Sequence, residues 1–143
     1  MFRSRPGPLM DIGDSGEASL IVQTGDTARA VEMSPEDSFP QVFATSRMVA
    51  LMELAASRLL NRLLKPGEQS VGVGMNVRHT AATPVRCRVR AVAEYLGRDG
   101  KLFRFRVEAF DEAGSIGSGE HTRAIVATER LLAGAERRRG PGA

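Results

Sequence analysis

The clearest hydrophobic pattern lies between residues 46 and 64, SRMVALMELAASRLLNRLL. Twelve of the seventeen residues from 48 to 64 are apolar, so the predicted helix carries apolar side chains on nearly every side. Thr45 precedes it as the expected N-cap, and Lys65-Pro66-Gly67 ends it. A helix of this kind is expected to be buried.

Downstream of this helix, apolar and polar positions alternate with a period of two, which predicts strands. The expected strands cover 17–24 before the helix and 71–79, 85–96, 101–110 and 115–128 after it. Short links at 97–100 and 111–114 favour antiparallel pairing. An apolar helix requires a sheet that curls around it, so we expect an α+β hotdog fold, an antiparallel β-sheet wrapped around one long central α-helix.

Length and composition fit a single globular domain. The chain has 143 residues, of which 42% are hydrophobic and 26% charged. We expect a flexible N-terminal segment over 1–16, the domain over 17–130 and a basic, solvated tail over 131–143. The chain has neither the apolar core of a signal peptide nor a run near the ~18 residues that cross a bilayer. A cytoplasmic protein without a membrane partner is therefore expected.

The charge distribution argues against a nucleic-acid partner. Of the net charge of +3, +2 falls within residues 136–143, and the chain has one Tyr and no Trp for base stacking. Cys87 is the only cysteine, and there are two histidines. These are too few for a His/Cys metal cluster, so no metal is expected.

Glu53 and His79 are the two residues most suited to chemistry. Glu53 interrupts the apolar helix, and no cation lies three or four positions away to pair with it. It therefore either pairs with an arginine from a strand or serves as a catalytic carboxylate. Alternation places His79 on the face of Val73 and Val77, toward the helix. It is either a hydrogen-bonded core residue or a proton-transfer group.

Other residues near these two have a structural and a functional interpretation. Thr45 lies at a helix N-terminus, where negative charge is favoured, although capping alone explains it. Gly72 allows a bulge or the close approach of a ligand. Phe39 and Phe43 form either a hydrophobic staple or a lid, and His121 is interpreted as structural or exposed. Arginines on the polar strand faces form either a solvated outer face or a rim for phosphates: Arg86, Arg88, Arg90, Arg104 and Arg106.

Three segments resemble the fluoroacetyl-CoA thioesterase family of hotdog proteins. They are FPQVFATSRMVALMELA at 39–55, VGVGMNVRHTAATP at 71–84 and IGSGEHTRAIV at 116–126. The resemblance implies a homodimer with active sites at the subunit interface. It also implies an acyl-CoA substrate, of which coenzyme A is a part, and no other cofactor.

The resemblance also assigns roles to single residues. Catalytic roles fall on three of them: Thr45, Glu53 and His79. Gly72 falls near the acyl group, Arg123 has a supporting role and Phe39 belongs to the lid. Phe43 is expected to be a second apolar lid residue because it lies close to Phe39 in the sequence. A further lid aromatic of the family is replaced by Glu36, which implies weaker selectivity for the fluoroacetyl group.

The expected function is hydrolysis of a short acyl-CoA, with fluoroacetyl-CoA among the candidates, to the free acid and CoA. One alternative is a hotdog acyl-CoA dehydratase or hydratase, which could not transform a saturated acyl-CoA. Another is a non-catalytic acyl-CoA-binding protein, and the joint presence of Thr45, Glu53 and His79 argues against it.

Overall fold

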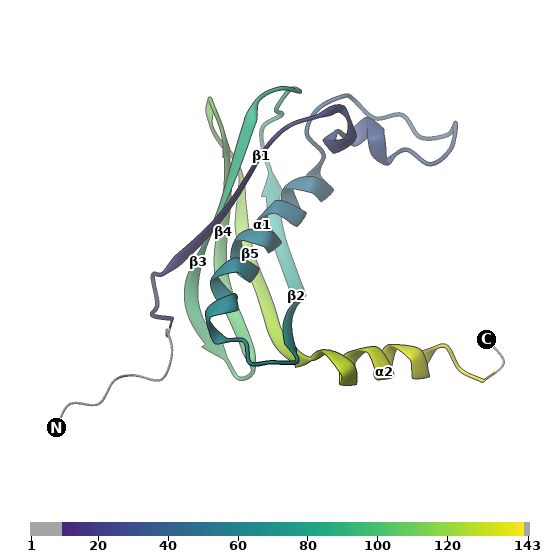
Figure 1. The fold of residues 1–143 in the computed structure, drawn as a ribbon. Coiled ribbons are helices and arrows are strands. Elements are labelled where there is room, and N and C mark those ends of the chain that lie inside the picture. Colours follow the sequence, from purple (N-terminus) through teal and green to yellow (C-terminus); the bar gives the residue numbers. More distant parts are fainter. Residues whose placement is uncertain (1–9, 142–143) are drawn as a thin grey trace.

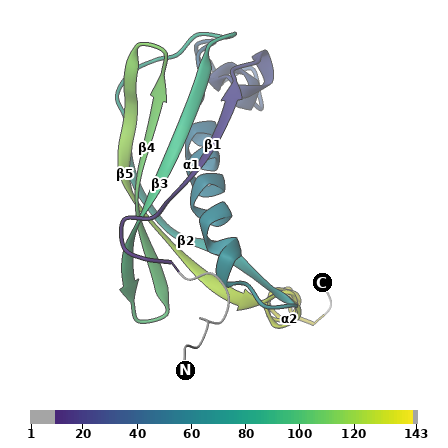
Figure 2. The same ribbon diagram turned by 60° about the vertical axis from the view of Figure 1, so that its left-hand side comes forward.

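A five-stranded antiparallel sheet curls around one long helix in the computed structural model, which describes residues 10–141. The strand order is β1-β3-β4-β5-β2, and α1 (Thr45–Leu60) lies against the concave face (Figures 1 and 2). The strands are β1 (Ser15–Ile21), β2 (Glu68–His79), β3 (Arg88–Asp99), β4 (Leu102–Asp111) and β5 (Gly114–Ala127). The predicted α+β hotdog architecture is confirmed.

The central helix has one open side. A short 3-10 turn, Asn61–Leu63, continues α1, so the helix predicted over 46–64 is confirmed. One face packs on the sheet and buries seven side chains: Met48, Leu51, Met52, Ala55, Ala56, Leu59 and Leu60. Leu54, however, is 46% exposed and Glu53 is partly exposed. The expectation that the helix is buried on all sides is wrong for the single chain, because the sheet covers only part of its circumference.

A β-bulge in β2 changes which residues face the helix. The register of β2 against β5 shifts between Gly72 and Gly74. A bulge adds one unpaired residue and so exchanges the two faces of the strand beyond it. Met75 and Val77 pack on the core, whereas Val73 is 56% exposed. The expectation that Val73 shares the inner face with His79 is therefore wrong.

The other strands agree with the predicted pattern, with small shifts at their ends. β3 begins at Arg88 rather than at 85, because Arg86 adopts a φ of 72° and turns the chain. β1 begins at Ser15, and the Gly13 N–H donates to the Tyr95 carbonyl at 2.9 Å. The part of the predicted flexible segment that is described is therefore attached to the sheet, and residues 1–9 lie outside the described residues.

The predicted C-terminal tail is helical over most of its length. Helix α2 (Thr128–Arg138) follows β5 and has no buried residue. It extends away from the sheet past β2 (Figure 1). The expected basic, solvated tail is therefore helical as far as Arg138 and exposed to solvent, and residues 142–143 lie outside the described residues. No helix within residues 10–141 is long and apolar enough to cross a membrane.

Candidate active site

Thr45 and His79 form one half of the candidate site. Thr45 is the first residue of α1, and its hydroxyl lies 2.8 Å from His79 Nδ1 at the end of β2. The prediction that Thr45 caps the helix is wrong, because Ala44 occupies the N-cap position. The ring of Phe43, buried at 1% exposure, meets the His79 ring edge-on with centroids 6.5 Å apart. Together these three residues line an open hollow of about 350 Å³.

The free nitrogen of His79 is suited to proton transfer. Among the residues that the structure describes, His79 Nε2 is buried and has no hydrogen-bond partner. Burial lowers the pKa of His79 below its ordinary value, because a charged imidazolium loses hydration there. The ring is therefore neutral near pH 7 and able to accept a proton from a water or a substrate.

Glu53 and Arg123 form the other half. Arg123 Nη1 on β5 lies 3.3 Å from Glu53 Oε2 on α1. The Arg123 side chain is 8% exposed and that of Glu53 is 41% exposed. Of the two interpretations of Glu53, pairing with a strand arginine is therefore what the described chain contains. The partner is the arginine to which the resemblance gave a supporting role, so the ion pair and a catalytic role are compatible.

The carboxylate of Glu53 lies directly over the backbone of β2 at Gly72. A Cβ atom added at Gly72 would collide with Glu53 Oε2 and would lie 3.4 Å from His121 Cε1. Only glycine leaves room for the carboxylate at this point, because any side chain would displace it. The bulge that follows turns this position of β2 inward.

Two residues of this half, His121 and Ser70, were not predicted from sequence as site residues. His121 is 1% exposed and lies between Arg123 and the Gly74 carbonyl. Ser70 accepts hydrogen bonds from Arg123 through its hydroxyl and its carbonyl, each at 3.0 Å. The alternation of β5 was a usable signal for His121, because residues two apart on a strand share a face.

Of the expected lid residues, Phe43 contacts His79, whereas Phe39 and Glu36 are outside the hollow around His79, as are the strand arginines. Phe39 is 44% exposed and is not part of the hollow around His79. Glu36 is also exposed. Three of the strand arginines face outward and pair with carboxylates at 3.6–3.8 Å: Arg90 with Glu17, Arg104 with Glu120 and Arg106 with Glu94. They agree with a solvated, charge-balanced outer face rather than a phosphate rim.

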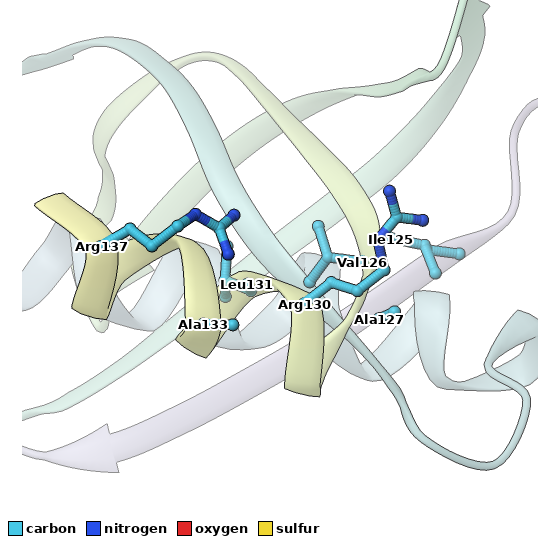
Figure 3. A pocket seen from close by; sticks show the side chains of 7 residues that line it. All are labelled: Ile125, Val126, Ala127, Arg130, Leu131, Ala133 and Arg137. Carbon is cyan, nitrogen blue, oxygen red and sulfur yellow. The ribbon is translucent and has the colours of Figure 1, made fainter.

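A second hollow, of about 500 Å³, lies where α2 leaves β5 (Figure 3). Arg130 and Arg137 extend over it from α2, and Ile125 and Leu131 form part of its apolar lining. It contains neither a carboxylate nor a histidine, so it offers no proton-transfer chemistry. Within residues 10–141, no group of three or more His, Cys, Asp or Glu side chains is arranged to hold a metal ion.

Comparison with known proteins identifies the family of this chain. Residues 22–129 match the family described as fluoroacetyl-CoA-specific thioesterase. The chain belongs to this family. It is 40% identical over 126 residues to the fluoroacetyl-CoA thioesterase of Streptantibioticus cattleyicolor, covering 87% of this chain and 91% of that protein. As a family member it is an acyl-CoA thioesterase.

Solved structures extend the similarity to three dimensions. A structure of the fluoroacetyl-CoA thioesterase FlK superimposes with a TM-score of 0.86 at 39% identity, covering 91% of this chain and 98% of that one. A thioesterase superfamily member from Thermus thermophilus has a TM-score of 0.81 at 30% identity, covering 95% and 96%. The hotdog-type fold is thus shared across thioesterases of quite different sequence.

Proposed function

We propose that the chain hydrolyses a short acyl-CoA to the free acid and coenzyme A, using Thr45, His79 and Glu53. The observation that carries this is a neutral histidine that is paired with a hydroxyl and has a free ring nitrogen, together with a carboxylate on the same helix as that hydroxyl, held by a buried arginine. A solved structure of a FlK variant holds fluoroacetate and CoA. Coenzyme A is part of the substrate, and no other cofactor is needed for the reaction.

The two halves of this site are too far apart to act together within one chain. Glu53 follows Thr45 by eight residues on the same helix, which at 1.5 Å per residue is about 12 Å along the axis. Two hydrogen bonds in series span only about 6 Å, which is half of this separation. A second copy of the chain offers a way to bring the missing half to each site.

We propose that this second copy pairs along β2. β2 is an edge strand, and an uncovered edge is a surface that proteins normally protect. Exposed apolar side chains lie beside it, Val73 on the strand and Leu54 on α1. An antiparallel pair of β2 strands about an axis near Met75 and Asn76 would bring Gly72 opposite the partner's His79. Glu53, which lies over Gly72, would then face the partner's Thr45–His79 pair.

In such a homodimer each residue has a defined task. The oxygen of the thioester gains negative charge during attack, and a backbone N–H at Gly72, assisted by the Thr45 hydroxyl, would stabilise it. His79 would move a proton through its free Nε2. Glu53 would either attack the carbonyl carbon, breaking the C–S bond and expelling CoA as its thiolate to leave an anhydride that water cleaves, or orient a water whose attack expels the same thiolate. After a single turnover in ¹⁸O-labelled water, label in the Glu53 carboxylate would demonstrate direct attack, because it enters there only when water cleaves the anhydride at the Glu53 carbonyl carbon.

A thiol-release assay over a panel of acyl-CoAs tests the proposal. The panel should contain acetyl-, fluoroacetyl-, propionyl- and longer saturated acyl-CoAs, none of which a dehydratase could transform. We expect turnover of the short members, reduced roughly 100-fold or more in Glu53→Gln and in His79→Ala. Turnover of no short acyl-CoA, or turnover unchanged in both variants, would overturn the proposal.

A further inference from the structure

His121 is a buried histidine to which the proposed reaction gives no task. It lies on β5, 1% exposed, and both ring nitrogens are engaged. Nδ1 lies 2.7 Å from the Gly74 carbonyl of the bulged strand, and Nε2 lies 3.2 Å from Arg123 Nη1. A histidine needed only to fill space would not require two polar partners on two different elements.

These two contacts fix the protonation of the ring. A carbonyl oxygen can only accept, so Nδ1 must carry the proton that is donated to Gly74. A guanidinium can only donate, so Nε2 must be unprotonated and accept from Arg123. The ring is thus neutral, and burial together with the charge of Arg123 lowers the pKa of His121. The other neighbours do not change this assignment. Phe105 on β4 packs an apolar ring against His121 and has no hydrogen-bonding group, and Glu53 on α1 is hydrogen-bonded to Arg123.

The Arg123 guanidinium contacts three residues, Ser70, His121 and Glu53. The contact with His121 determines where the Nη1 atom of Arg123 points. Nε and Nη2 donate to Ser70, while Nη1 contacts both His121 Nε2 and Glu53 Oε2. The shared nitrogen couples the imidazole to the carboxylate. Without an acceptor at His121, Nη1 would lose one of the two contacts that hold it at this place.

We propose that His121 is a positioning residue for the thioesterase site, acting through Arg123 on Glu53. This inference rests on the proposed function, because it assumes that Glu53 takes part in the reaction. The ring acts as a neutral acceptor that directs Nη1 toward the carboxylate. The bond from Nδ1 to Gly74 holds the ring in the tautomer that can do so. His121 itself touches no substrate in this scheme.

Two substitutions separate positioning from space-filling. The amide of Gln reaches the location of Nε2, so His121→Gln retains an acceptor for Arg123. The amide of Asn reaches only the location of Nδ1, so His121→Asn retains the donor to Gly74 and lacks that acceptor. We expect His121→Asn to lower kcat about tenfold or more with KM changed less than twofold, and His121→Gln to stay within about threefold of the parent kcat. Val89→Ala, a buried variant on β3, which β4 separates from β5, controls for lost stability.

A structural role alone would give a different result. The proposal is overturned if Asn and Gln lower kcat equally, if neither lowers it, or if the loss in His121→Asn is matched by Val89→Ala at the same melting temperature. In an Arg123→Lys background, His121→Asn should have little further effect, because the residue through which His121 acts has changed. An undiminished effect there would also overturn it.

A spectroscopic measurement keeps this test separate from the proposed function. Long-range ¹H–¹⁵N spectra of the parent protein at pH 7 should show His121 as the neutral tautomer with the proton on Nδ1. A proton on Nε2, or an imidazolium, would overturn the positioning scheme. If the parent hydrolyses no acyl-CoA while His121 has the expected tautomer, the proposed function fails and the hydrogen-bond geometry stands.

Discussion

Mixing two inactive variants tests whether each active site is shared between two subunits. Glu53→Gln removes the carboxylate from one half of the site, and His79→Ala removes the imidazole from the other half. About 12 Å of helix separates Thr45 from Glu53 within a chain, which is why the halves are proposed to meet across the dimer. A mixed dimer would then contain one site with both substitutions and one site with neither.

The expected gain follows from counting sites. Each variant alone should retain roughly 1% of parent activity or less. If subunits associate at random, about half of the dimers are mixed, and each contains one intact site of two. The unpurified mixture should therefore recover about a quarter of parent activity, roughly 25 times the activity of either variant alone, and the purified mixed dimer about half.

A matched control uses two residues of the same half. Thr45→Val mixed with His79→Ala damages both sites of every mixed dimer, so no recovery is expected. The assay is thiol release after the variants are co-expressed with different affinity tags and the doubly tagged dimer is purified. Purified mixed dimer of Glu53→Gln and His79→Ala with no more activity than its parents would refute a shared site.

Four further predictions concern single residues. Gly72→Ala should lower kcat at least tenfold while the protein stays folded, because the new methyl group displaces the Glu53 carboxylate; unchanged kcat would contradict that contact. Thr45→Ala should cost less activity than Thr45→Val, since alanine leaves room for a replacement water, and the reverse order in kcat would contradict this. Glu36→Phe should raise the kcat/KM ratio of fluoroacetyl-CoA to acetyl-CoA, and a large ratio that the substitution leaves unchanged would show that Glu36 has no bearing on selectivity. The pH profile of kcat/KM should fall on the acid side through a pKa below the ordinary 6.5 of histidine, because protonating His79 removes the base; a limb above 6.5 would contradict the effect of burial.

The architecture could be predicted because its signals are local. The apolar run over 46–64 and the period-two alternation after it correspond to α1 and to β2–β5. Where these local patterns predicted the structure wrongly, the reason was the same. A single residue, or a partner distant in sequence, changed which way a side chain faces. The bulge at Gly72 and Gly74 exchanges the faces of β2, and a pattern count that assumes continuous alternation cannot detect it.

The candidate site was predictable in its residues but not in its contacts. Glu53 stood out as a carboxylate in an apolar helix, yet its partner Arg123 lies 70 residues away in sequence. His121 was interpreted as structural or exposed because the sequence around it is polar. Its position two residues before Arg123 on β5 was a local signal, but only the sheet register, which pairs it with Met75 on β2, brings it against the Gly74 carbonyl. Contacts of this kind depend on tertiary structure, and no local pattern encodes them.

The exposure of helix α2 affects how readily proteases can cut the C-terminal end of this chain. It is 11 residues long and buries no side chain, and helices below roughly 12–15 residues are marginal in water on their own. Its order in solution must therefore be supplied by something it touches. Because it extends past β2, the proposed pairing edge, a partner subunit would be that support. The C-terminus would then be protected from proteases at high protein concentration and cut at its arginines on dilution, so that the lifetime of the full-length chain would depend on its own abundance.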